Sequence, residues 1–224
     1  MKKLVISLVI FLAAAVSVTL IAFSGTSENL AEAKLQKEKP KAESCCATDM
    51  DETASTNFSE NSVYQVNSNW KNQFGNDVHI GDLKGKTQIF TMIFANCTYA
   101  CPILANDMRR IEDALTKDEL RNVQFTLISI DPDRDTPERL KEFADNQNLN
   151  LARFQLLTGK RSDIDDLAAL TGFRYKEEND GSFSHSNIIT ILNKEGEIIH
   201  QQVGLNQDIQ KTLEVIKNQT KLGV

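Results

Sequence analysis

Two nearly continuous apolar stretches constrain the fold of this chain more than any other feature. TQIFTMIF occupies residues 87–94 and VQFTLISI occupies residues 123–130. Both are rich in β-branched and aromatic residues, which is typical of strands that are covered on both faces. Between them, CPILANDMRRIEDAL (101–115) has its apolar side chains at helical spacing. This order predicts two parallel strands that are joined by a crossover helix.

The next elements continue the alternation of helices and strands. Thr136 and Pro137 suit the N-cap and first position of a helix with the sequence PERLKEFADNQ. FQLLT is a third strand candidate. Ser162 with Asp165 resembles a capping box that opens a further helix, and Gly172 is placed to end it.

The remaining elements complete the order of a thioredoxin-like fold. SVYQV and DVHI are short strand candidates, NIITIL (187–192) and EIIHQQV (197–203) predict a hairpin, and a last helix is expected over 207–217. We therefore expect a three-layer α/β domain over residues 61–224, with a central mixed sheet. Residues 154–176 would be an insertion into it.

The N-terminal segment, residues 1–24, contains an uncharged apolar run from Leu4 to Phe23. A membrane span needs about 20 such residues, and the core of a signal peptide usually has about 7–15. A single transmembrane anchor is therefore favoured, and a cleaved signal is the alternative. Because Lys2 and Lys3 precede the run, the rest of the chain is expected on the extracytoplasmic, periplasmic face of the cell membrane.

Residues 25–60 differ in composition from the rest of the chain. They are rich in Ser, Thr, Glu, Lys and Asn and poor in large apolar residues, so they predict a flexible, disordered tether. The tether contains the adjacent pair Cys45 and Cys46, which either captures a metal ion transiently, pairs with a partner or is incidental. The net charge of −6 and the pI near 5.2 argue against nucleic acid as a partner.

The predicted topology brings three sequence-distant groups to one edge of the sheet. Cys97 and Asp131 lie just beyond the carboxyl ends of two parallel strands, and open α/β sheets bind ligands at that edge. The hairpin strand NIITIL should run antiparallel to them, so the preceding loop, with His185, returns to the same edge.

Cys97 and Cys101 lie one helical turn apart near a helix N-terminus, where backbone N–H groups favour thiolate over thiol. Three residues separate the two cysteines, one more than the two that usually separate them in thiol-disulfide oxidoreductases. By itself, it is compatible with a redox couple, half of a metal site or a structural disulfide bond.

His185 favours the metal site among these alternatives. A thioredoxin-type reductase normally places a cis-proline opposite its cysteines, and none of the four prolines of this chain can occupy that place. Two thiolates and one imidazole form a soft ligand set that suits copper in either oxidation state. Cuprous ion accepts three ligands, whereas structural zinc usually has four.

Three motifs, NCTYACP, SIDPDRDTPERLKEF and FSHSNIITILNKEGEIIHQQVG, resemble the Sco/SenC family of copper-binding, thioredoxin-fold proteins. The resemblance covers roughly residues 62–217 and places the family's copper ligands on Cys97, Cys101 and His185. It implies a chaperone that delivers Cu(I) or Cu(II) to the dinuclear copper centre of cytochrome c oxidase subunit II, or to another copper protein. Thr98 and Ser184 depart from the family pattern, where a proline and an aspartate are common.

Two other functions would use the same groups. A thiol-disulfide reductase would keep the cysteines of the oxidase copper site reduced, with Cys97 as the attacking thiolate and Cys101 as the resolving thiol. A redox or copper sensor would act through a partner without turnover. The reductase needs the cysteine pair alone, whereas the chaperone also needs His185.

Other residues of metal-binding type are expected to have structural roles. DPDRDTP is typical of a strand-to-helix turn, so Asp133 and Asp135 are interpreted as turn residues, while Asp131 is expected to support the copper ligands from behind. The remaining candidates are expected to be structural or packing residues: His79, His200, Met92 and Tyr99.

Overall fold

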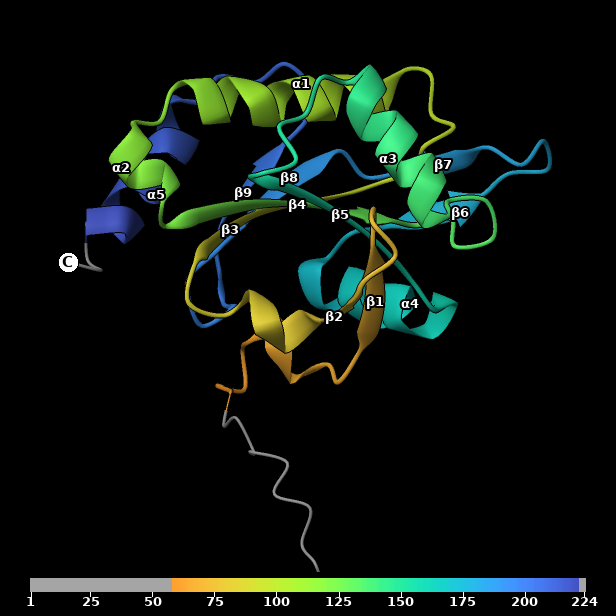
Figure 1. Ribbon diagram of the computed structural model, residues 1–224, viewed down its shortest axis with the longest axis horizontal. Coiled ribbons are helices and arrows are strands. Elements are labelled where there is room, and N and C mark those ends of the chain that lie inside the picture. The colour runs from red at the N-terminus through yellow and green to blue at the C-terminus, as the bar shows by residue number, and fades with distance from the viewer. Residues whose placement is uncertain (1–57, 222–224) are drawn as a thin grey trace, which may run out of the picture. The chain divides into compact units, whose positions relative to one another are not determined.

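The computed structural model describes residues 58–221, where a seven-stranded mixed sheet forms the centre (Figure 1). Its strands are β1 (Asn69–Asn72), β2 (Asp77–His79), β3 (Thr87–Ile93), β4 (Val123–Ser129), β5 (Phe154–Gly159), β8 (Ile188–Leu192) and β9 (Ile198–Val203). Their order across the sheet is β2-β1-β5-β4-β3-β8-β9. Two further strands, β6 (Tyr175–Glu177) and β7 (Phe183–His185), form a separate antiparallel pair.

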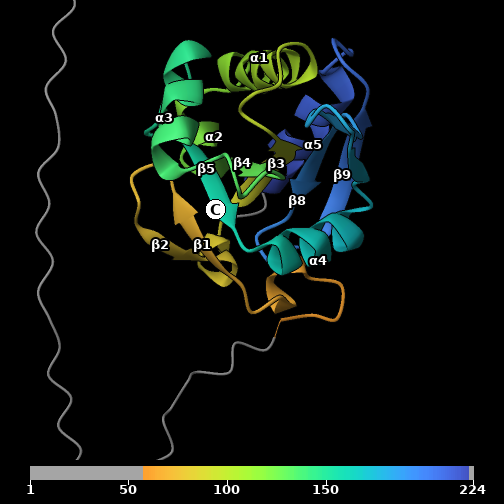
Figure 2. The same cartoon turned by 90° about the vertical axis from the view of Figure 1, so that its right-hand side faces the viewer.

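Helices cover both faces of this sheet. They are α1 (Ala100–Asp113), α2 (Lys117–Leu120), α3 (Pro137–Asn146), α4 (Arg161–Thr171) and α5 (Gln210–Lys221), together with the 3-10 turns η1 (Val63–Gln65) and η2 (Ile80–Leu83). Helices α1 and α3 lie on one face and α4 on the other (Figure 1, Figure 2). The predicted three-layer α/β arrangement with a central mixed sheet is confirmed.

The two apolar stretches form the central parallel pair, as predicted. All seven residues of β3 are buried, and β4 pairs with it in parallel from Thr87 opposite Val123 to Ile93 opposite Ser129. Helix α1 crosses between them and buries Leu104, Met108 and Ile111 on its inner face. Burial of each of these large aliphatic side chains contributes about 1.5–3 kcal/mol to the stability of the core.

The hairpin of β8 and β9 returns the chain beside β3. Strand β8 pairs antiparallel with both β3 and β9. The Oδ1 atom of Asn193 accepts the backbone N–H groups of Glu195 and Glu197 and so closes the turn. Gly196 has a φ of 86°, a conformation that favours glycine. As a result, the residues before β8 lie at the carboxyl edge of β3 and β4.

Local sequence patterns correctly predicted two helix boundaries. Thr136 caps α3 by accepting a hydrogen bond from the backbone N–H of Arg139, and Pro137 occupies the first helical position. Gly172 ends α4 in the left-handed conformation with a φ of 67°.

One predicted element and two predicted helix starts were wrong. The stretch 62–66 contains the 3-10 turn η1 instead of a strand, because the Ser62 hydroxyl accepts the Tyr64 N–H and closes a turn. Helix α4 begins after Lys160 and not at Ser162, whose hydroxyl donates to the neighbouring carboxylate of Asp163. Helix α5 starts at Gln210, whose N–H donates to the Asp208 carboxylate, so it begins later than expected.

The structure also contains elements that the sequence patterns did not predict. Strands β1, β6 and β7 and helix α2 were missed. The stretch 154–176, interpreted as an insertion, begins with β5, which lies inside the main sheet between β4 and β1.

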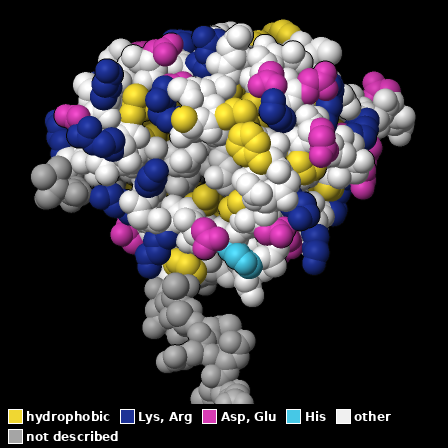
Figure 3. All heavy atoms as spheres, in the orientation of Figure 1, with side chains coloured by type: hydrophobic (Ala, Val, Ile, Leu, Met, Phe, Trp, Pro, Cys, Tyr) yellow, Lys and Arg dark blue, Asp and Glu magenta, His cyan; other side chains and the backbone are white. Residues whose placement is uncertain are grey.

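On the face that Figure 3 shows, basic and acidic side chains of the described residues are interspersed, so no large patch of one charge is present there. Between residues 58 and 221, the structure has no helix with the length and apolar content of a membrane span. The apolar run from Leu4 to Phe23, the pair Cys45 and Cys46, and most of the predicted tether lie outside the described residues.

Gly159 provides a test of this packing. A Cβ atom added there would lie 2.6 Å from the ring of Trp70, which is 1% exposed and donates its indole N–H to the Ser68 hydroxyl. We expect Gly159→Ala to lower the free energy of unfolding by about 1–3 kcal/mol through overpacking. Urea denaturation should show a lower midpoint with an unchanged slope.

The control is the same substitution in a Trp70→Leu background, where the crowding atom is removed. There Gly159→Ala should cost much less than in the wild-type chain. Strictly additive costs would show that the two residues do not clash.

Candidate metal centre

The two cysteines are placed by the junction of β3 with α1. Cys101 lies in the first turn of α1 and is fully buried, while Cys97 lies in the loop before it and is half-buried. The backbone N–H of Cys101 donates to the Cys97 sulfur over 3.3 Å, and the N–H of Phe94 donates to the Cys101 sulfur over 3.5 Å. Both sulfur atoms are therefore oriented by backbone donors.

His185 brings its imidazole to the same place from the end of β7. Its Nε2 atom lies 3.8 Å from the Cys101 sulfur. Its Nδ1 atom lies 2.9 Å from the Ser186 carbonyl oxygen, which can only accept, so Nδ1 carries the proton. The Nε2 lone pair is consequently left for a ligand on the cysteine side. The three ligand atoms all lie within 4.8 Å of one another.

Aromatic side chains enclose the imidazole. The Phe173 ring stacks on it with centroids 5.9 Å apart, and the Phe94 ring meets it edge-on at 5.8 Å. Phe183 in turn packs against Phe94 at 5.2 Å. These buried rings restrict the rotation of His185 and exclude water from one side of the site.

The two cysteines differ sharply in acidity. The pKa of Cys97 is lowered to about 3, chiefly because the Cys101 side chain donates a hydrogen bond to its sulfur, with His185 and backbone donors adding to the effect against burial. Burial, followed by the hydrogen bond to Cys97 and then by the charge of Cys97, raises the pKa of Cys101. Cys97 is therefore the thiolate and Cys101 the thiol at neutral pH.

The Cys97 thiolate also affects the pKa of His185. Burial favours the neutral ring, but hydrogen bonds to Cys97 and to the Ser186 carbonyl outweigh it, so the pKa of His185 is raised. The Cys97 thiolate would stabilise the protonated form of the ring, whereas the neutral form keeps the Nε2 lone pair for a ligand.

The arrangement of these three side chains fits one soft metal ion. Metal bonds of about 2.3 Å to sulfur and about 2.0 Å to nitrogen let one ion bridge ligand atoms that are this close. In the part of the chain that the structure describes, this is the cluster of His, Cys, Asp and Glu side chains that could hold a metal. The predicted convergence of Cys97, Cys101 and His185 is confirmed, while their role as ligands stays a prediction.

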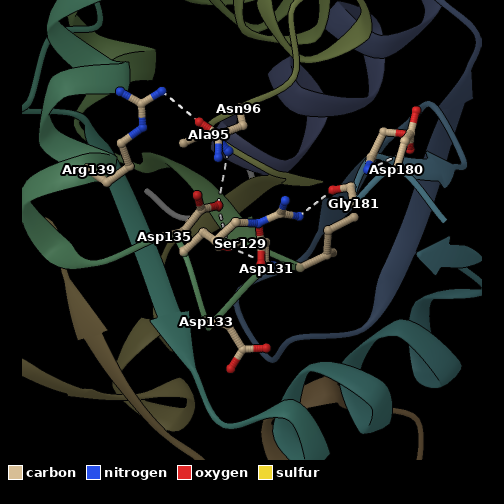
Figure 4. Close-up of polar contacts among 12 residues, drawn as sticks. Ala95, Asn96, Ser129, Asp131, Asp133, Asp135, Arg139, Asp180 and Gly181 are labelled. Carbon is tan, nitrogen blue, oxygen red and sulfur yellow. Dashed lines mark hydrogen bonds and ion pairs between the residues drawn. The ribbon is translucent and has the colours of Figure 1, made fainter. Parts of the chain in front are cut away.

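The acidic residues after β4 lie at the same sheet edge but have other partners. Asp131 is buried and its carboxylate accepts from the Arg134 side chain over 2.5 Å. The Asp135 carboxylate is also buried and accepts from the Ala95 N–H and the Ser129 hydroxyl over 2.9 and 2.6 Å (Figure 4). Asp135 is thus a link between β4 and the cysteine loop, which its interpretation as a turn residue did not anticipate.

The other candidate residues have mostly structural positions. His79 is exposed, Met92 is in the core, and His200 lies 3.1 Å from the Thr212 hydroxyl. Tyr99 was expected to pack, which is wrong, because its side chain is 73% exposed beside Cys97.

Sequence reasoning missed the residues that orient the imidazole. Phe173 follows the Gly172 cap of α4, and the Ser186 carbonyl is a backbone group with no sequence signature. The alternation of aromatic and polar residues around Tyr175 and Phe183 was the available indication of the β6–β7 pair, in which Tyr175 pairs with His185.

Curated proteins with related sequences agree with this architecture. The chain is 29% identical over 140 residues to the SCO1 protein homolog of Bacillus subtilis, covering 61% of this chain and 72% of the relative. It is 31% identical over 120 residues to a protein of Stutzerimonas stutzeri that is named as a proposed copper-binding protein, covering 52% and 57%.

Solved structures show the same fold. BsSco, whose structure is described as identifying a disulfide switch in a member of the Sco family of cytochrome c oxidase assembly proteins, matches with a TM-score of 0.60. Identity is 26%, and the match covers 69% of this chain and 91% of BsSco. The family model described as SCO1/SenC matches residues 59–221, which is nearly all of the described region. The chain therefore belongs to the SCO1/SenC family.

Proposed function

We propose that this protein binds one copper ion through Cys97, Cys101 and His185 and delivers it to the dinuclear copper centre of cytochrome c oxidase subunit II. The observation that carries the proposal is the convergence of two sulfur atoms and one imidazole nitrogen within 4.8 Å. Membership of the SCO1/SenC family supports copper as the ion, as does the name of the Stutzerimonas stutzeri relative.

The ligand types favour copper over the other common metals. Thiolate and imidazole are soft or borderline ligands, which suit copper and bind calcium and magnesium poorly. A three-ligand set is sufficient for Cu(I) but leaves structural zinc one ligand short. The half-exposed Cys97 gives the ion access from solvent, while the buried Cys101 and the enclosed His185 hold it from the protein side.

Each of the three residues has a distinct part in uptake and release. Cys97 is already a thiolate and attracts the cation first. Cys101 must give up its proton as its sulfur binds, which makes affinity depend on pH. His185 offers Nε2 in a fixed direction because Nδ1 is bonded to the Ser186 carbonyl. Transfer then proceeds by exchange of these ligands for the thiolates of the acceptor.

The proposed acceptor and location are consistent with one another. BsSco is described as a member of a family of cytochrome c oxidase assembly proteins. The apolar run from Leu4 to Phe23, with Lys2 and Lys3 before it, would anchor the domain on the outer face of the cell membrane, where the oxidase copper centre is assembled.

His185→Ala tests the copper site. With the imidazole lost and both sulfurs retained, we expect the affinity for Cu(II) to fall by at least about 100-fold, while Cu(I) still binds to the two thiolates. Titration of the full chain with each ion, followed by absorption and by competition with a chelator, measures both. His200→Ala is the matched control and should bind like the wild type. Unchanged Cu(II) binding by His185→Ala would refute the site.

Delivery is tested separately with an acceptor. Copper-loaded protein, mixed with the metal-free soluble domain of oxidase subunit II, should transfer its copper, and the absorption spectrum of the dinuclear centre should appear. His185→Ala loaded with Cu(I) should transfer it without building the complete centre. Retention of all the copper by the wild-type donor would contradict the delivery function, although not the site.

A thiol-disulfide reductase is the second candidate, and the unequal acidity of the cysteines favours it. The half-buried Cys97 thiolate would attack a partner disulfide, forming a mixed disulfide and releasing one partner thiolate. The Cys101 thiol, after losing its proton, would then attack the Cys97 sulfur. The products are a Cys97–Cys101 disulfide and a partner that has gained two electrons.

The acidity of Cys97 predicts how its reactivity depends on pH. With a pKa of about 3, Cys97 stays a thiolate down to low pH, so its alkylation by iodoacetamide should be nearly constant from about pH 5 to about pH 8. An ordinary cysteine with a pKa of about 8.5 would react far faster at the upper end. Mass spectrometry of the peptide that contains Cys97 measures the rate.

Substitutions of Cys101 isolate the cause of this acidity. Cys101→Ala removes the hydrogen-bond donor and should shift the onset of Cys97 alkylation to higher pH. Cys101→Ser keeps a donor and should leave the onset closer to that of the wild type. Identical profiles for the two variants would show that the side chain at position 101 does not set the acidity.

A further inference from the structure

The hairpin that carries His185 is not a part of the main sheet. Strands β6 and β7 pair with each other in a two-stranded sheet, whereas the cysteine loop follows β3 in the seven-stranded sheet. Strand β8 anchors the chain just after His185, but the hairpin tip needs another attachment. We propose that Arg134 is a positioning residue that holds the β6–β7 hairpin, and with it the His185 imidazole, in register with the cysteine loop.

Arg134 makes three contacts that together reach from β4 to the hairpin. Its Nε donates to the buried Asp131 carboxylate over 2.5 Å, and its Nη2 donates to the Gly181 carbonyl at the hairpin tip over 2.5 Å (Figure 4). Its guanidinium also lies 5.6 Å from the centre of the Phe183 ring. A planar guanidinium can bridge two acceptors and stack on a ring at once, which a lysine cannot do.

The contact with Phe183 leads directly to the imidazole. Phe183 and His185 are both on β7, so the position of one restricts the backbone of the other. Phe183 packs on Phe94 at 5.2 Å, and Phe94 meets the His185 ring at 5.8 Å. Arg134 therefore holds one side of a stack of rings that ends at the proposed ligand.

Gly181 is suited to receive Arg134. Its φ of 76° favours glycine, and an added Cβ would lie 3.0 Å from the Arg134 Nη1 atom. A side chain at this position would therefore strain the hairpin tip and push the guanidinium away, while leaving Asp131 in place.

The cysteine loop is held by other residues that follow β4. Asp135 accepts the N–H of Ala95, and Arg139 donates to the Asn96 side chain over 2.8 Å (Figure 4). The turn after β4 thus holds the cysteine loop through Asp135 and the histidine hairpin through Arg134. Loss of Arg134 should disturb the imidazole and spare the dithiol, a selectivity that a general loss of stability would not produce.

The test is Arg134→Gln in the full chain, and it rests on the proposed copper site. We expect the affinity for Cu(II) to fall by about 10- to 100-fold, as is usual when a residue that supports a metal ligand is removed. The Cys97–Cys101 disulfide should still form when the variant is treated with oxidised glutathione, because both cysteines and their backbone donors are retained. Gly181→Ala, which displaces the guanidinium without removing Arg134 or Asp131, should reproduce the loss of affinity.

Arg153→Gln is the matched control. Arg153 also donates through Nε to a largely buried carboxylate, that of Glu112, over 2.5 Å, and its side-chain exposure of 36% resembles the 38% of Arg134. This pair lies at the opposite edge of the sheet, where β5 begins and α1 ends. Arg153→Gln should be destabilised to a similar extent in urea and bind Cu(II) like the wild type.

A readout without copper separates this proposal from the copper function. In the metal-free protein, the ¹⁵N resonances of the His185 ring should shift or broaden in Arg134→Gln and not in Arg153→Gln. If the wild type binds no copper, the copper function fails and this measurement decides the positioning role. Wild-type ring resonances in Arg134→Gln would overturn it, and so would failure of both Arg134→Gln and Gly181→Ala to fold, since the contact would then serve the fold as a whole.

Discussion

The parallel pairing of β3 with β4 is the constraint on which the site depends. Both strands are buried on two faces, so their register is enforced by the whole core. Their carboxyl ends therefore meet at a fixed edge, and the loops that follow carry Cys97 and Asp131. The antiparallel return of β8 brings His185 to that edge from the other direction. The sulfur and nitrogen atoms, which are far apart in sequence, converge because the pairing of β3 with β4 and β8 brings their loops to the same edge.

At this edge, the proposed ligands come from two differently supported parts of the chain, the β3–α1 junction and the β6–β7 hairpin. The cysteines are on α1 and its entry loop, where backbone N–H groups fix the sulfur atoms. The imidazole is on a two-stranded ribbon that is connected to the sheet through β8, through stacked phenylalanines and through Arg134. Pre-organisation of the soft ligands is thus divided between main-chain hydrogen bonds on one side and side-chain packing on the other.

Long-range features of the fold could be predicted from the sequence, and local exceptions could not. The apolar stretches that became β3 and β4 identified the central sheet, because continuous burial leaves a strong pattern. Strand β1 was missed because NWKN buries a single side chain, Trp70, and shows no periodicity. Residues 62–66 have the composition of a strand, but the Ser62 hydroxyl competes with sheet pairing and forms a turn.

The convergence of the three proposed ligands followed from topology, whereas their surroundings did not. The Ser186 carbonyl and the ring of Phe173 reach His185 through backbone geometry and packing, which a linear pattern does not encode.

The unequal burial of the two sulfur atoms has a consequence for the proposed exchange of copper with a partner. In the proposed transfer, an incoming thiolate would approach from the Cys97 side, so the outer sulfur would be displaced first and the interior sulfur of Cys101 would detach last. The depth of each sulfur atom beneath the surface would thereby set the sequence in which the proposed metal bonds are broken.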